Sequence, residues 1–108
     1  MLRRSVSAIV AAAALAVSAP ASADPTPQRQ DDLIYLLRQD CGSCHGMTLK
    51  GGLGPPLLPS NLAEISDEAL VETILRGRQD TPMPPWHVFL SEAEARWMVQ
   101  SLKQGLAE

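Results

Sequence analysis

The pentapeptide Cys41-Gly42-Ser43-Cys44-His45 holds the residues of this chain best suited to chemistry. Two thiols separated by two residues and followed at once by a histidine have the spacing of a c-type haem attachment site. Thioether bonds to two porphyrin vinyl groups require sulfurs a short turn apart, and the next side chain then lies under the iron. The spacing therefore predicts covalent haem attachment through Cys41 and Cys44, with His45 as the proximal ligand.

Three other interpretations of this motif are less well supported. A thioredoxin-like redox pair needs a strand before the motif and a helix after it, whereas here helical sequence precedes and a glycine-rich segment follows. A zinc site needs two further soft or imidazole ligands, and the chain has two cysteines and, besides His45, only His87. A disulfide across two residues would be strained and would close a very small loop.

The first 23 residues have the features of a secretory signal peptide. Arg3 and Arg4 form a positively charged N-terminal region, and the apolar residues 5–17 that follow are too few to span a bilayer. Ala21-Ser22-Ala23 is a small-x-small cleavage site. We expect cleavage after Ala23 and export to the periplasm, which leaves residues 24–108 as the functional domain. An uncleaved N-terminal anchor is the alternative.

Length and charge narrow the possible partners. A chain of 108 residues forms one domain, and its formal charge of −3 becomes −5 once Arg3 and Arg4 are removed. Such a small acidic protein binds nucleic acids and anionic membranes poorly. A partner protein that recognises it through electrostatic attraction should present a basic surface. A domain of this size has a thin core, which a covalently held porphyrin would reinforce.

Capping signals predict three helices and no strand. Thr26 caps the first helix, which runs to about Asp40, and Ser66 caps the second, over residues 67–76 before Gly77. Ser91 and Glu94 form a capping box for the third helix, over residues 92–104. The side chains expected on the buried face of this last helix are Ala93, Trp97, Met98, Val99 and Leu102.

Two loops carry the remaining candidate residues. Residues 46–57 contain four glycines and two prolines, so they cannot form regular structure. One backbone carbonyl of this loop can accept a hydrogen bond from Nδ1 of His45, and that of Pro55 is the best placed. Residues 81–86 hold three prolines and form a stiff, extended segment.

Met83 is the favoured second axial ligand, because Pro82 and Pro84 fix its backbone and reduce the entropy lost on binding. His87 is its main competitor. Met47 lies too close to His45 in the sequence to round the porphyrin edge, and Met98 is in phase with core residues. Histidine and methionine ligation raises the reduction potential and leaves no open iron site, which favours an electron carrier over an enzyme.

The haem motif, Gly54-Pro55-Pro56-Leu57 and Met83-Pro84 together resemble class I cytochrome c over nearly the whole of residues 24–108. The resemblance implies an all-α fold around one covalent haem c, with axial His45 and Met83. The carbonyl of Pro55 would hold His45, and Leu57 would fill the haem pocket. The helix bearing Trp97 would cross the first helix near Leu37. Pro56 departs from the family, in which a polar residue is common there.

The segments 41–57, 81–86 and 91–97 more narrowly resemble the NirC-type small periplasmic cytochromes. This likeness implies electron delivery to the cytochrome cd-type nitrite reductase of denitrification, by a monomer that forms transient complexes with its redox partners. A role in maturation of the reductase's special haem is the alternative. A peroxidase-like enzyme would require Met83 to leave the iron. Lys50, Arg76 and Arg78 are each candidates to contact the propionates or to remain solvated. Trp86 is a candidate to donate a hydrogen bond to a propionate through its indole N–H or to cap the haem pocket.

Overall fold

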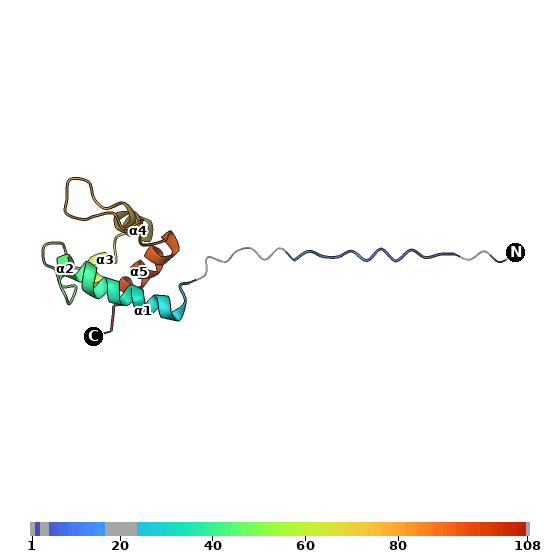
Figure 1. Cartoon of the computed structure of the whole chain (residues 1–108), viewed down its shortest axis with the longest axis horizontal. Coiled ribbons are helices and arrows are strands. Elements are labelled where there is room, and N and C mark those ends of the chain that lie inside the picture. The colour runs from blue at the N-terminus through green and yellow to red at the C-terminus, as the bar shows by residue number, and fades with distance from the viewer. Residues whose placement is uncertain (1, 3–4, 17–23, 108) are drawn as a thin grey trace.

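A computed structural model describes residues 2, 5–16 and 24–107, and its regular structure is entirely helical over these residues (Figure 1). The elements in chain order are α1 (Pro27–Leu36), the π-helix η1 (Leu37–Cys41), α2 (Gly42–His45), α3 (Pro59–Leu62), α4 (Asp67–Arg76) and α5 (Glu92–Gln104).

The predicted signal peptide falls partly outside the described residues. Arg3, Arg4 and the predicted cleavage site at residues 21–23 lie outside them, and residues 5–16 form no helix or strand. Within the described chain, no helix has both the length and the apolar character needed to cross a membrane.

The helices begin where local sequence can satisfy their first backbone N–H groups. The side-chain oxygens of Thr26 and Ser66 accept from the amides of Arg29 and Ala69. At α5 the capping box is complete, because the Glu94 amide donates to Ser91 Oγ over 3.1 Å and the Ser91 amide donates to Glu94 Oε1 over 2.9 Å. The three predicted N-termini are therefore confirmed.

The core lies where α1 and α4 pack against α5. Leu33 of α1 and Leu37 of η1 share a buried cluster with Met98 and Leu102 of α5, and Trp97 packs against that cluster. A second cluster joins α4 to α5 and consists of Val71, Ala95 and Val99. The contact expected between the first and last helices near Leu37 is thus present, and the all-α fold is confirmed.

Three features of the helices differ from the sequence prediction. The first helix does not stay α-helical to Asp40 but passes into η1 at Leu37, and the short helix α3 was not expected. Ala93 is exposed and Ala95 is buried instead. The buried stripe of α5 runs through residues 95, 98, 99 and 102, a helical spacing in which position 93 falls outside the stripe.

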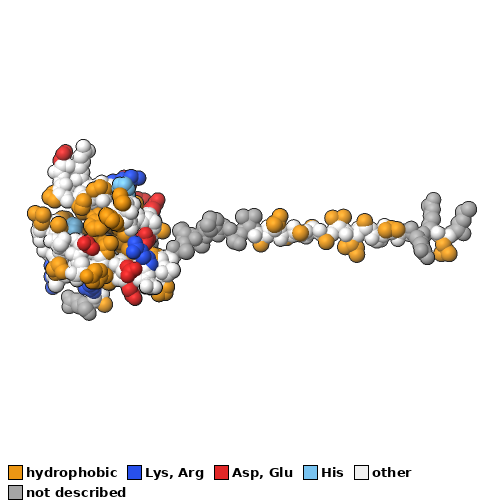
Figure 2. Space-filling view, in the orientation of Figure 1, with side chains coloured by type: hydrophobic (Ala, Val, Ile, Leu, Met, Phe, Trp, Pro, Cys, Tyr) orange, Lys and Arg blue, Asp and Glu red, His pale blue; other side chains and the backbone are white. Residues whose placement is uncertain are grey.

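Charged side chains of both signs lie on the face of the helical domain that Figure 2 shows. On the face shown in Figure 2, acidic and basic groups are interspersed with apolar ones, and neither sign occupies a whole face. The charges on this face are therefore mixed in sign.

Candidate functional site

The single π-helical turn η1 leads into the segment that contains the two cysteines. η1 continues directly from α1, and the amide of Gly42 donates to the carbonyl of Leu37, five residues earlier. Single π-turns inside helices frequently occur at functional sites. Cys41 and Cys44 follow on helical backbone, three residues apart, so their side chains lie on one face of the segment. Both thiols are free and half-buried.

The ionisation of Cys41 argues against a thiol–disulfide function. Burial and the neighbouring Asp40 carboxylate raise the pKa of Cys41 to about 11. The thiol is therefore protonated at neutral pH, whereas redox-active pairs rely on a thiolate with a lowered pKa. The described residues also contain no strand and no cluster of three or more His, Cys, Asp or Glu suited to a metal ion.

The loop of residues 46–58, here called the motif loop, folds back onto the C-terminal end of α2. The amide of Gly51 donates to the carbonyl of His45, and that of Gly54 donates to the carbonyl of Cys44, both over 2.8 Å. These bonds satisfy carbonyls that a helix end leaves without partners. Gly46 makes the reversal possible, because its φ of 94° is unfavourable for other residues.

His45 is held in one tautomer. Its Nδ1 lies 2.7 Å from the carbonyl oxygen of Pro55. A carbonyl can only accept, so Nδ1 carries the proton and the lone pair of Nε2 remains available to a metal. The contact that we predicted between His45 and Pro55 is therefore present in the structure.

Gly54 belongs to a motif noted in the sequence, but its contact with His45 was not foreseen. A Cβ built on Gly54 would lie 2.8 Å from Cε1 and 2.9 Å from Nδ1 of His45, so the glycine backbone lies against the imidazole ring. Its position directly before Pro55 was the available signal, since a glycine there permits close approach to the ring. Leu57, also predicted to be in the site, is half-buried and packs against the core cluster of α1 and α5.

Met83 lies in the loop of residues 77–90, here called the methionine loop. Its carbonyl accepts from the amide of Arg78 over 3.2 Å, and its own amide donates to Thr81 Oγ1 over 3.3 Å. The hydroxyl of Thr81 in turn donates to the carbonyl of Arg78 over 2.7 Å. Met83 thus closes a compact turn, and its side chain is half-buried rather than part of the core.

The methionine loop is fixed to the end of α4. The amides of Trp86 and His87 donate to the carbonyls of Ile74 and Leu75 over 2.9 and 3.2 Å. Gly77, predicted only as the end of a helix, has a φ of 69°, and a Cβ there would lie 2.6 Å from the carbonyl oxygen of Met83. Only glycine allows the loop to lie this close to the helix end.

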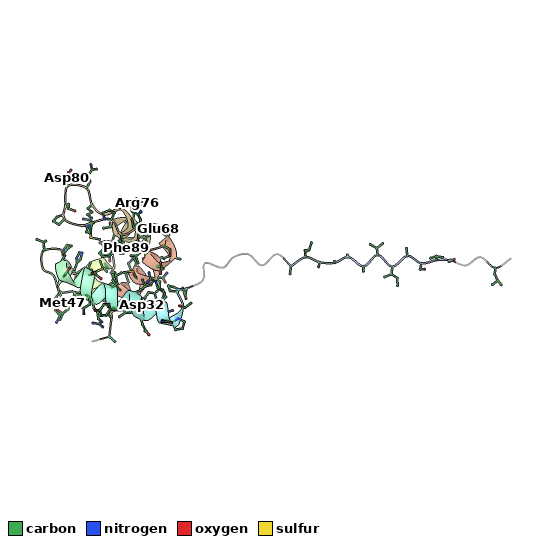
Figure 3. All side chains as sticks on the ribbon, viewed as in Figure 1. Asp32, Met47, Glu68, Arg76, Asp80 and Phe89 are labelled. Carbon is green, nitrogen blue, oxygen red and sulfur yellow. The ribbon has the colours of Figure 1, made fainter. Side chains whose placement is uncertain are left out.

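The rival ligands lie in different surroundings. Met98 is fully buried in the core, as predicted, whereas Met47 is 56% exposed. Figure 3 shows Met47 near α2, away from the methionine loop, whose tip is marked by Asp80. His87 is exposed, and its amide is bound to α4. Figure 1 shows the motif loop and the methionine loop at the same end of the helical domain.

These groups fit a haem c. Two free thiols share a helical face, the adjacent imidazole has its Nδ1 bound and its Nε2 free, and the loop that contains Met83 lies at the same end of the domain (Figure 1). Lys50, Arg76 and Arg78 are exposed, so each is accessible to a propionate or to solvent.

The chain is similar to known cytochromes over most of its helical domain. Residues 28–100 match the family described as cytochrome C oxidase, cbb3-type, subunit III. Cytochrome c55X of Pseudomonas aeruginosa is 54% identical over 81 residues, which are 75% of this chain and 68% of that protein. The solved structure of the c-type cytochrome NirC is 53% identical with a TM-score of 0.74, and the match covers 75% of this chain and 95% of NirC.

A larger protein contains a similar unit. The structure of the dihydro-heme d1 dehydrogenase NirN in complex with DHE is 37% identical with a TM-score of 0.63, over 69% of this chain and 16% of NirN. Taken with the NirC and c55X matches, the haem motif and the helical fold show that the chain belongs to the NirC-type small class I cytochromes c, electron carriers with one covalently bound haem c.

Proposed function

We propose that the chain acts in the periplasm, after removal of residues 1–23, as a one-electron donor to the cytochrome cd-type nitrite reductase of denitrification. The similarity to NirC and to cytochrome c55X supports this role. The N-terminal sequence, with its positive start, apolar run and small-x-small site, supports export. The redox partner would bind transiently to the monomer, as is usual for electron-transfer proteins with small interfaces.

In this proposal Cys41 and Cys44 would hold haem c through thioether bonds, and His45 and Met83 would ligate its iron. The observation that carries the assignment is the 2.7 Å contact from Nδ1 of His45 to the carbonyl of Pro55, which leaves Nε2 free to bind iron. Leu57 would line the haem pocket. When bound, haem c supplies a reversible one-electron centre, and two strong axial ligands leave no position for a substrate.

The electron-donor role can be tested by stopped-flow spectroscopy. Reduced holoprotein is mixed with purified cytochrome cd-type nitrite reductase, with nitrite or without it as the control. We expect the haem of this chain to be oxidised in continuous turnover only when nitrite is present. If the reductase presents a basic surface to this acidic chain, the rate falls as salt is added. Failure of the reductase to oxidise the protein at any salt concentration would reject the proposal.

A redox role in maturation of the reductase's special haem is the second candidate. Its support is the similarity to one part of NirN, the dihydro-heme d1 dehydrogenase, because a unit like this chain is there joined to a dehydrogenase. A strain that lacks this chain separates the two roles. Reductase that is purified from it with a full cofactor complement favours electron supply, whereas reductase without its special haem, under normal electron flow, favours maturation.

A further inference from the structure

The guanidinium of Arg29 joins three parts of the fold. Arg29 belongs to α1, and its Nε donates to Oε2 of Glu94, which lies in the first turn of α5. Its Nη2 donates to the carbonyl oxygen of Phe89 over 3.3 Å. Phe89 stands near the C-terminal end of the methionine loop, and Figure 3 shows it beside the helices, whereas Asp80 marks the tip of the loop. A single side chain thus connects α1, α5 and this loop.

Glu94 offers Arg29 a fixed anchor. Its Oε1 accepts from the amide of Ser91 over 2.9 Å, and its own amide donates to Ser91 Oγ. This capping box holds the carboxylate in one orientation at the start of α5. The hydrogen bond from Arg29 also lowers the pKa of Glu94, so the carboxylate stays ionised at neutral pH. A planar guanidinium held in this way can keep a second N–H directed at Phe89.

The chain between Phe89 and Met83 is suited to transmit a displacement. Pro84 and Pro85 follow Met83 directly, and their rings restrict the backbone of both prolines and of the residues before them. Trp86 comes next, and its carbonyl accepts from the amides of Phe89 and Leu90 over 2.9 and 3.0 Å. The turn from Trp86 to Phe89 is thus bound to the end of α4 on one side, through the amides of Trp86 and His87, and to Arg29 on the other, through the carbonyl of Phe89. Met83 precedes this turn by two prolines, so the position of the turn restricts the position of Met83.

We propose that Arg29 is a positioning residue for Met83: through Glu94 and the carbonyl of Phe89 it holds the methionine loop so that the thioether stays on the iron. This inference rests on the proposed function, in which Met83 is an axial ligand. An ordinary exposed ion pair would contribute little and act only on overall stability. Arg29 differs because its second contact is to the backbone of the loop that carries the ligand.

The test is the rate at which added imidazole replaces Met83 in the oxidised holoprotein, measured well below the unfolding temperature. Arg29→Gln removes both contacts, and we expect the rate to rise roughly tenfold, as for the loss of a hydrogen bond from a charged group. Arg96→Gln is the matched control. Arg96 is 35% exposed against 38% for Arg29, and its partners are Glu68 and Glu92 on helices, away from the loop. In Arg96→Gln, the rate at which imidazole replaces Met83 should stay within about twofold of the wild-type rate.

Arg29→Lys separates positioning from overall stability. A lysine can keep the ion pair with Glu94 but cannot also reach Phe89 with a fork of donors. We expect this variant to recover the thermal stability of wild type while its imidazole rate remains raised. A rate equal to that of Arg96→Gln in both Arg29 variants would overturn the inference. If Arg29→Gln does not fold, the rate of Arg29→Lys alone decides between the two outcomes.

Met83→Ala distinguishes this inference from the proposed ligation. With the thioether removed, imidazole should bind at the rate of simple association. If Met83→Ala binds in this way while both Arg29 variants behave as wild type, Met83 is a ligand and Arg29 does not position it. If Met83→Ala itself binds imidazole as slowly as wild type does, the ligand assignment fails, and the inference fails with it.

Discussion

Replacement of Gly54 by alanine tests the geometry around His45. The added Cβ would lie 2.8 Å from Cε1, 2.9 Å from Nδ1 and 3.3 Å from Nε2 of the imidazole ring, whereas ordinary contact begins at 3.4 Å. The ring or the loop must therefore move by about 0.6 Å. Overpacking of this kind typically costs about 1–3 kcal/mol. The movement also strains the 2.7 Å hydrogen bond from His45 to Pro55.

Thermal unfolding of the holoprotein, followed by circular dichroism, measures the effect. For a domain of this size, 1 kcal/mol corresponds to about 4–8 °C, so Gly54→Ala should unfold at least about 4 °C below wild type. NMR spectra of the reduced protein should also show faster solvent exchange of the Nδ1 proton of His45. Both changes follow from displacement of the same ring.

Gly42→Ala is the matched control within the haem motif. Gly42 has a helical φ of −61°, and a Cβ there would meet its nearest atoms at 3.4 Å or more. Because glycine is a poorer helix former than alanine, this variant should be as stable as wild type or slightly more stable. The reasoning would be refuted if Gly54→Ala unfolded at the wild-type temperature, or if Gly42→Ala lost more stability than Gly54→Ala.

Three further predictions concern the ligand Met83, the covalent attachment of the haem, and the ion pair between Arg29 and Glu94. Met83→Ala should lower the reduction potential, because a neutral thioether favours the ferrous state. It should also leave an open iron position, so the ferrous protein should bind carbon monoxide. If the spectrum of the oxidised wild-type protein has no sulfur-to-iron charge-transfer band, an enzyme is favoured instead. Replacement of both Cys41 and Cys44 by alanine should leave residues 24–108 largely unfolded, since the small core loses its covalent haem; a well-dispersed NMR spectrum of the haem-free protein would contradict this. Glu94→Gln should cost roughly 1 kcal/mol at neutral pH. Arg29 lowers the pKa of Glu94, so the difference in the free energy of unfolding between wild type and Glu94→Gln should be fully present above pH 4.5, the ordinary pKa of a glutamate. It should disappear as the pH falls through the lowered pKa. A difference in stability that remains at low pH would exclude the ion pair as its cause.

The starts of the three predicted helices were predictable because their signals are local. Thr26, Ser66 and Ser91 cap the helices within three residues of their own positions, so no information from distant parts of the chain is needed. The π-turn of η1 and the short helix α3 were missed. A π-turn has no strong sequence signature, and α3 holds only four residues, too few to show a hydrophobic period.

The chemical identity of the site also came from the sequence. Cys41, Cys44 and His45 are adjacent on one helical turn, so their spacing alone specifies covalent haem attachment. The contact of Pro55 with His45 was foreseen because few residues of a short loop can return to the ring. These features depend on groups close together in the chain, and the backbone offers them few alternative arrangements.

The tertiary structure decided which distant groups share the site and what holds them there. Gly54 lies against the imidazole ring, Gly77 admits the backbone of Met83 at the end of α4, and Arg29 reaches both Glu94 and Phe89. Of these contacts, only that of Gly54 has a signal in the sequence, its position directly before Pro55. The two glycine contacts arise because each loop folds back onto the end of its own helix. The Arg29 contacts exist because α1 packs against α5, and only that packing brings residues 60 and 65 positions apart in the chain within reach of each other.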